Sequence, residues 1–269
     1  ETGRAMIDLE PNLVEEGLLI HFAERMAQGE HLYRDLVFFT GPLPFELLAQ
    51  LFRWFGAEIE VGRTATAVIH GVNAAAAYGL VQRAGSGPLA QLSGALVAAL
   101  PILLFPLFSI FYYTPLAFSF GLVAAYSTLR GIDSRPWAFV AGLSIAAVAL
   151  CKQTLGVVLA ASLLAALLAS TPSERRLRQA LALVVGGVLA ALVTVGLYAV
   201  RGDLADLWRC LVTIPLSLEA SFSSRYMNLW PIGKLADALE PHKVIYFPNL
   251  YYLRHGVYAH LPATLVAAV

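Results

Sequence analysis

The sequence predicts an all-α protein, a multi-span transmembrane helical bundle with interfacial helices in its first outer loop. Its 269 residues are 58% hydrophobic and only 13% charged, and their mean hydropathy is +0.69. Soluble proteins carry about 25% charged residues. Several apolar runs also approach or reach the about 20 residues that a membrane-spanning helix needs. These observations exclude an ordinary soluble enzyme and a secreted disulfide scaffold.

The charge and cysteine counts exclude two further classes of protein. The chain has 18 Lys and Arg against 18 Asp and Glu, so its net charge is zero. Without a global basic field we expect no nucleic-acid partner. Cys151 and Cys210, the two cysteines, lie far apart in the sequence, so neither a disulfide framework nor a thiolate metal site is expected.

The apolar runs predict six full spans and divide the chain into four segments. The spans are expected at 64–82, at 88–129 (two spans, broken near 111–115), at 136–170 (two short spans in a hairpin with Lys152 at its tip) and at 179–200. The four segments are an acidic extracytoplasmic loop (1–62), a six-span bundle (63–200), a second extracytoplasmic loop (201–256) and the start of a further span (257–269). We therefore expect this sequence to be a fragment of a longer protein.

The distribution of charge predicts the direction of the spans. If spans alternate, one side of the membrane holds Arg83, Arg130, Arg135, Arg175, Arg176 and Arg178 against only Asp133 and Glu174. Basic residues in short loops favour the cytoplasm. We therefore expect a multi-pass protein of the cell (inner) membrane, with residues 1–62 and 201–245 extracytoplasmic. A single span over 136–170 would instead place the arginine-bearing loops on opposite faces.

The acidic first segment predicts two short helices. Asn12 and Glu15 have the spacing of a capping box, and apolar residues then recur at helical spacing, which predicts a helix over 13–28 ending at Gly29. A second helix is expected from Leu43 to Phe55, after a Gly-Pro turn. At about 20 Å it is too short to span comfortably. Both helices are therefore expected to lie at the outer membrane surface.

Short motifs follow one another along this segment. They are Glu15-Glu16-Gly17, Ala23-Glu24-Arg25-Met26, Gly29-Glu30, Tyr33-Arg34-Asp35, Gly41-Pro42, Leu51-Phe52-Arg53-Trp54-Phe55-Gly56 and then Arg63. Their order and spacing resemble the first outer loop of GT-C type polytopic membrane glycosyltransferases, in the branch of protein O-mannosyltransferases and aminoarabinose lipid A transferases. The later run Leu150-Cys151-Lys152-Gln153-Thr154 resembles the fifth-span region of the same superfamily.

The resemblance implies transfer of a sugar from a polyprenyl-phosphate donor to a lipid, glycan or protein acceptor on the outer face of the bilayer. It implies that the first carboxylate of the loop is the base or positions the acceptor. Glu15 occupies that position, and Glu16 is the second catalytic candidate. Direct displacement of this kind inverts the anomeric centre. From the residues alone, Glu15 also suits a helix cap, and Glu16 suits the first turn of a helix, where the dipole favours an acid.

Five further residues are candidates for substrate binding. Tyr33, Arg34 and Asp35 either contact the donor phosphate, for which Arg is suited, or form a surface ion pair. Lys152 either pairs with the lipid-linked phosphate or extends its ammonium to the interface. Arg225, in the second outer loop, suits acceptor contact or an interfacial belt.

No cofactor is expected. A divalent metal held by His21 or His31 with Glu15 or Glu16 is the alternative, but no metal-ligand spacing such as His-x-x-x-His occurs. His70 and Asn73 are expected to face the bundle interior.

Two other functions are open from the residues alone. A transporter or flippase for lipid-linked sugars would place polar groups at the bilayer midplane, often in paired repeats of broken helices. The expected spans are nearly free of charge and show no repeat, which favours the enzyme. A non-catalytic membrane scaffold is the third alternative.

Overall fold

A computed structural model describes residues 15–83, 87–103 and 110–217, without the side chains of Glu15 and of residues 100–103. Residues 1–214 form one compact unit and residues 215–269 a second, of which only 215–217 are described. The described residues fold into helices, and the bridge between Leu32 and Leu36 is the one β-type pairing among them. The all-α prediction is confirmed.

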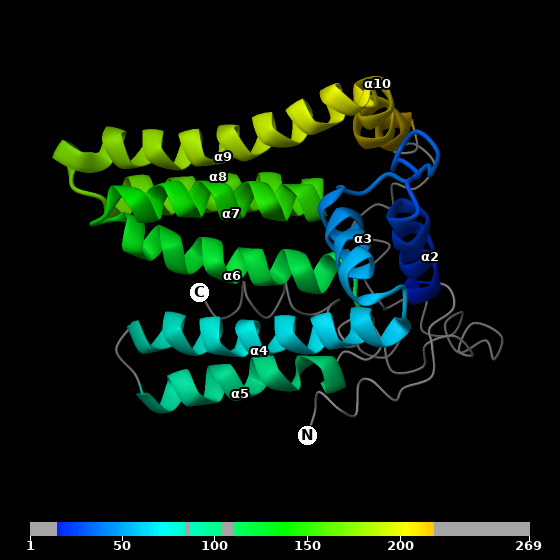
Figure 1. The fold of residues 1–269 in the computed structure, drawn as a ribbon. Coiled ribbons are helices and arrows are strands. Elements are labelled where there is room, and N and C mark those ends of the chain that lie inside the picture. The colour runs from blue at the N-terminus through cyan, green and yellow to red at the C-terminus, as the bar shows by residue number, and fades with distance from the viewer. Residues whose placement is uncertain (1–14, 84–86, 104–109, 218–269) are drawn as a thin grey trace, which may run out of the picture. The chain divides into compact units, whose positions relative to one another are not determined.

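Nine α-helices and one π-helical turn make up the described part of the chain. They are α2 (Glu15–Ala27), α3 (Leu43–Phe55), α4 (Ile59–Arg83), α5 (Gly87–Leu103), α6 (Tyr113–Gly131), α7 (Arg135–Cys151), α8 (Gln153–Ser170), α9 (Ser173–Arg201), α10 (Leu204–Trp208) and η1 (Arg209–Thr213). Helices α4 to α9 occupy the positions of the six predicted spans. They run alongside one another, while α2 and α3 lie across one end (Figure 1).

Only α8 and α9, of the helices described, are long and apolar enough to cross a membrane. Helix α7 and the first part of α5 are apolar but shorter. Helix α9 leaves large aliphatic side chains uncovered; Val185, Leu192 and Val193 are each more than half exposed. Contiguous apolar surface of this kind is typical of a face that meets lipid or another protein.

Helices α7 and α9 pack at very close range because glycines face each other. A Cβ atom on Gly142 of α7 would lie 1.9 Å from the carbonyl oxygen of Leu183, and one on Gly186 of α9 would lie 2.2 Å from the carbonyl oxygen of Phe139. Small residues at helix contacts let backbones approach in membrane proteins. No larger residue fits either position without moving a helix.

The two short helices predicted before the bundle are both present. Helix α3 has the predicted bounds, with Pro42 at its N-cap and Gly56 after its end, at a φ of 93° that favours glycine. Helix α2 is described from Glu15, so the proposed cap at Asn12 lies outside the described residues. Buried apolar side chains of α2 and α3, including Met26 and Phe45, belong to one core.

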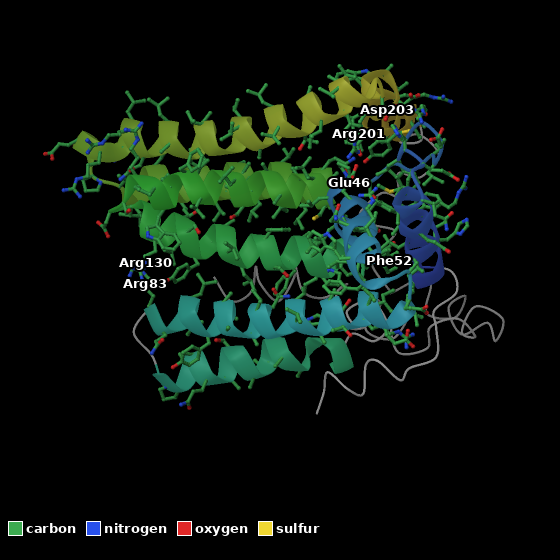
Figure 2. All side chains as sticks on the ribbon, viewed as in Figure 1. Glu46, Phe52, Arg83, Arg130, Arg201 and Asp203 are labelled. Atoms are coloured by element: carbon green, nitrogen blue, oxygen red, sulfur yellow. The ribbon has the colours of Figure 1, made fainter. Side chains whose placement is uncertain are left out.

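Lys152 interrupts the helical run between α7 and α8, as predicted for the tip of a hairpin. The two helices are tightly apposed there, because a Cβ on Gly156 would lie 2.4 Å from the Cα of Ala149. Figure 2 shows Arg83 and Arg130 at the end of the bundle opposite to Glu46 and Asp203. Alternating spans require this arrangement.

Candidate active site

The second of the two candidate carboxylates is held in a buried ion pair. Glu16 is 2% exposed, and its oxygens accept hydrogen bonds from Arg63 at the start of α4: Nε to Oε1 and Nη2 to Oε2, each 2.9 Å. Arg63 is 3% exposed. A bidentate guanidinium–carboxylate pair is strong and directional, so this contact fixes the first turn of α2 against α4. Both oxygens of this carboxylate are therefore already engaged by Arg63.

Glu15 begins α2, one residue before Glu16. The structure describes the backbone of this residue but not its side chain. Neighbouring residues of a helix point about 100° apart, because each turn takes 3.6 residues. The Arg63 contact of Glu16 therefore sets Glu15 on a different face of the first turn of α2.

The Tyr33-Arg34-Asp35 turn is fixed mainly by its tyrosine. Tyr33 has a φ of 75°, a left-handed conformation that non-glycine residues seldom adopt. Its buried hydroxyl donates to the Thr40 carbonyl oxygen at 2.7 Å, and its ring centroid lies 5.7 Å from that of Tyr198. Burial raises the pKa of Tyr33 well above its ordinary value, so the phenol stays protonated. Tyr33 thus fixes the conformation of this turn through its buried contacts.

Arg34 is shared by two carboxylates. Its Nη2 lies 3.1 Å from Oδ2 of Asp35, and its Nη1 lies 3.2 Å from Oδ1 of Asp203. Asp203 follows α9 and is 1% exposed, and its other oxygen contacts Nδ1 of His31. The hydrogen bond from Arg34, then that from the backbone N–H of His31, lowers the pKa of Asp35 below its ordinary value. Arg34 therefore has two anionic partners within the protein itself.

The neighbours of Lys152 make two contacts with the segment between α2 and α3, one between backbones and one from a side chain to a carbonyl oxygen. A Cβ on Gly41 would lie 1.9 Å from the carbonyl oxygen of Leu150, so the end of α7 touches the Gly-Pro turn. Gln153 Nε2 donates to the Phe39 carbonyl oxygen at 3.2 Å. These contacts place the hairpin tip beside the loop that joins α2 and α3.

The Lys152 side chain is exposed, and its Nζ lies 5.5 Å from the centroid of the Tyr113 ring. Among the described residues, no carboxylate lies within ion-pair distance of this ammonium. Lys152 therefore keeps its charge available for an anionic ligand, in contrast to Arg34 and Arg63.

Glu46 joins α3 to the end of α9 through two contacts. Glu46 accepts a hydrogen bond from the hydroxyl of Tyr198 at 3.2 Å and forms an ion pair with Arg201. Figure 2 shows Glu46, Arg201 and Asp203 at the same end of the unit. The loop and α3 are thus tied to α9 through both Glu46 and Asp203.

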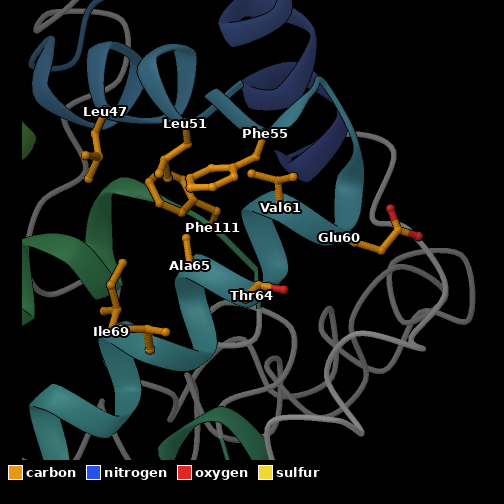
Figure 3. Close-up of a pocket in the computed structure, with 10 residues that line it drawn as sticks. Leu47, Leu51, Phe55, Glu60, Val61, Thr64, Ala65, Ile69 and Phe111 are labelled. Atoms are coloured by element: carbon orange, nitrogen blue, oxygen red, sulfur yellow. The ribbon is translucent and has the colours of Figure 1, made fainter. Parts of the chain in front are cut away.

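An apolar cavity of about 550 Å³ lies between α3 and α4. Figure 3 shows Leu51 and Phe55 of α3 facing Val61 and Ala65 of α4, with Phe111 beside them. Glu60 is the one ionisable group that lines it, among the residues described. The size lies within the range of ligand pockets.

The remaining candidates lie apart from these groups or outside the described residues. His70 and Asn73 are buried on α4, as predicted for the bundle interior. Arg225 lies outside the described residues. Within residues 15–83, 87–103 and 110–217, no three His, Cys, Asp or Glu side chains gather in a way that could hold a metal ion.

Asp203 is the residue of this site that sequence reasoning missed. A local signal was present: Gly202, at a φ of 79°, ends α9, and Asp203 occupies the N-cap position before α10, where an acid is common. Its partners His31 and Arg34 stand 172 and 169 residues away, so no spacing rule could have paired them.

Comparison with known proteins agrees with the resemblance seen in the motifs. No curated protein and no solved structure was found to match the chain. A sequence model of the dolichyl-phosphate-mannose-protein mannosyltransferase family matches residues 40–198, which is more than half of the chain. The matched region runs from the turn before α3 to near the end of α9 and contains Lys152. The chain therefore belongs to the dolichyl-phosphate-mannose-protein mannosyltransferase family, whose members are membrane glycosyltransferases.

Proposed function

We propose that this chain carries the donor site of an inverting glycosyltransferase that moves mannose from a polyprenyl phosphate to an acceptor hydroxyl at the extracytoplasmic face of the cell membrane. The observation that carries the proposal is that Lys152, with no carboxylate partner among the described residues, lies beside the outer loop at the bundle end crossed by α2. Glu15 is the first residue of that helix.

Glu15 is the base in this proposal. The acceptor oxygen attacks the anomeric carbon and gives its proton to the Glu15 carboxylate, while the bond from that carbon to the phosphate oxygen breaks. The electron pair leaves with the polyprenyl phosphate. General-base catalysis of this kind contributes about 10²–10⁴-fold to a rate. Glu16, which Arg63 holds, orients the first turn of α2 and with it Glu15.

Lys152 binds the donor phosphate and stabilises the negative charge that grows on it as the sugar leaves. Positive groups aimed at developing charge are a large source of catalysis. Tyr33, Arg34 and Asp35 shape the neighbouring wall of the site through their contacts with Thr40 and Asp203. Arg225 is proposed to contact the acceptor.

The apolar cavity between α3 and α4 takes part of the hydrocarbon chain of the donor. Its lining is aliphatic and aromatic apart from Glu60 and Thr64. The Glu60 carboxylate repels an anionic head group, so only the hydrocarbon suits this space. Phe111, which lines the cavity, stands two residues before Tyr113, on whose ring Lys152 lies.

The positions of the charged side chains support one orientation of the chain in the membrane and a reaction that needs no metal ion. Residues 1–62 and 201–245 are proposed to be extracytoplasmic, since Arg83 and Arg130 lie at the end of the bundle opposite to Glu46 and Asp203. Asp35, Asp203 and Glu46 are each held by arginine. Transfer by the full-length protein should therefore survive treatment with EDTA, and recovery only on adding Mg²⁺ or Mn²⁺ would contradict this.

The proposal is tested by the binding of a prenyl phosphate to the full-length protein in detergent. Farnesyl phosphate is the probe, because it needs neither the sugar nor the acceptor. Lys152→Met should weaken its binding by about tenfold or more, and Lys152→Arg should restore part of it. Thr154→Val, at an exposed position of the same hairpin tip, is the matched control and should bind like the wild type. Equal affinity in the wild type and Lys152→Met contradicts the proposal.

A further inference from the structure

The search for a further residue of the donor site leads to the N-terminus of α6. Tyr113 is the first residue of that helix, and its ring lies under the Lys152 ammonium at 5.5 Å from Nζ to the ring centroid. The Tyr113 ring also lies against that of Tyr112, with centroids 3.9 Å apart. Tyr113 is half-buried, whereas Lys152 is exposed.

We infer that Tyr113 is a positioning residue of the donor site: its ring face holds the Lys152 ammonium where it can meet the donor phosphate. This inference rests on the proposed role of Lys152. Nothing in the sequence singled out Tyr113 for this role, because 39 positions separate the two residues and only the fold brings them together.

An aromatic ring suits this task better than a carboxylate. A carboxylate beside Lys152 would fix the ammonium but cancel its charge, as Asp35 and Asp203 do for Arg34. The ring face attracts a cation through its quadrupole and carries no net charge. The ammonium is therefore restrained while its attraction for a phosphate is kept.

Restraint matters because lysine has a long and flexible side chain. Fixing its rotamers on binding costs free energy that a preorganised side chain has already lost. Gln153, bonded to the Phe39 carbonyl oxygen, fixes the backbone next to Lys152, and the Tyr113 ring fixes the distal end of the side chain. The two contacts together define the position of Nζ.

The same fold supplies a matched control. Tyr126, at the other end of α6, carries the guanidinium of Arg130 at 5.5 Å from its ring centroid. This contact belongs to the opposite end of the bundle, where Figure 2 places Arg130. Tyr126→Leu removes a ring of the same kind from the same helix without touching the donor site.

The experiment measures the Kd of farnesyl phosphate for the full-length protein in detergent. Tyr113→Leu should raise Kd by about two- to tenfold, the range that a single cation–π contact supports. Tyr113→Phe, which keeps the ring, and Tyr126→Leu should stay close to the wild type. In a Lys152→Met background, Tyr113→Leu should add no further loss, because the contact is already gone.

The outcomes separate this inference from the proposed function. If Lys152→Met weakens binding but Tyr113→Leu does not, or if the two losses add fully, Tyr113 does not act through Lys152. If Lys152→Met binds as tightly as the wild type, the phosphate role of Lys152 fails, and this inference fails with it. Should Tyr113→Leu not fold, fluorinated phenylalanines at position 113 keep the ring shape while weakening its negative face; affinity that does not fall with fluorination overturns the inference.

Discussion

Arg63 of α4 and Glu16 of α2 form a two-pronged ion pair in which both N···O distances are 2.9 Å and both side chains are almost fully buried. The two residues are 47 positions apart, so this pair joins α2 to the first helix of the bundle. It also fixes the helix turn that carries Glu15.

The first prediction concerns this ion pair. Arg63→Met leaves the Glu16 carboxylate buried without its guanidinium and should destabilise the protein by about 3–5 kcal/mol, as broken buried pairs do. A lower midpoint of thermal unfolding in detergent measures this. The double variant Glu16→Leu/Arg63→Met removes both charges and should regain much of the loss. A single variant as stable as the wild type would show that the pair contributes little.

The second prediction concerns acid pH. The hydrogen bond from Arg34 lowers the pKa of Asp35 below its ordinary value of 3.8. The resulting stabilisation is complete above the unfolded-state pKa, near 3.8, and is lost as pH falls through the lowered folded-state pKa. The wild type should therefore unfold at higher temperature than Asp35→Asn at pH 6, and this difference should shrink below pH 4. A difference that is constant from pH 6 to pH 3 would exclude a contribution from the charge of Asp35.

The third prediction concerns the apolar cavity. Ala65→Trp places an indole in the space between α3 and α4 and should weaken binding of a long polyprenyl phosphate more than that of a short one. Ala75→Trp, at an exposed position of the same helix, is the control. The comparison is the ratio of the two Kd values in each variant. An unchanged ratio in Ala65→Trp would show that the chain lies elsewhere.

The fourth prediction concerns orientation. Ser173 begins α9 at the end of the bundle opposite to Glu46, and Ser223 belongs to the proposed outer loop. In intact cells, a membrane-impermeant thiol reagent should label a Ser223→Cys variant and leave Ser173→Cys unlabelled until the cells are opened. The buried native cysteines Cys151 and Cys210 are replaced by alanine in both variants. Labelling of Ser173→Cys from outside would reverse the topology.

Local sequence signals were sufficient to predict the limits of a helix whose ends are marked by proline and glycine. Helix α3 has its predicted limits because Pro42 fixes its entry and Gly56 ends it. The break at Lys152 was predictable because a charge between two apolar runs has to reach the membrane surface. The six spans stay a prediction, since only α8 and α9, among the described helices, are both long and apolar enough to cross a membrane.

The partners of the charged side chains were not predictable. Glu16 is an acidic residue in the first turn of a helix, where the helix dipole favours an acid. Its carboxylate nevertheless pairs with Arg63 of another helix. Arg34 was expected to meet either phosphate or Asp35, and it meets Asp35 together with the distant Asp203. Such pairs depend on how helices pack, and no periodicity within one helix encodes that packing.

The base is tested most directly by Glu15→Gln in the full-length protein. The assay follows the release of polyprenyl phosphate from polyprenyl-phosphate mannose in membranes that contain the native acceptor. Glutamine keeps the shape of the side chain and removes the base, so turnover should fall by about 10²–10⁴-fold while farnesyl phosphate binding stays close to that of the wild type. Near-normal turnover of Glu15→Gln, with the protein folded and binding the prenyl phosphate, would contradict the carboxylate mechanism.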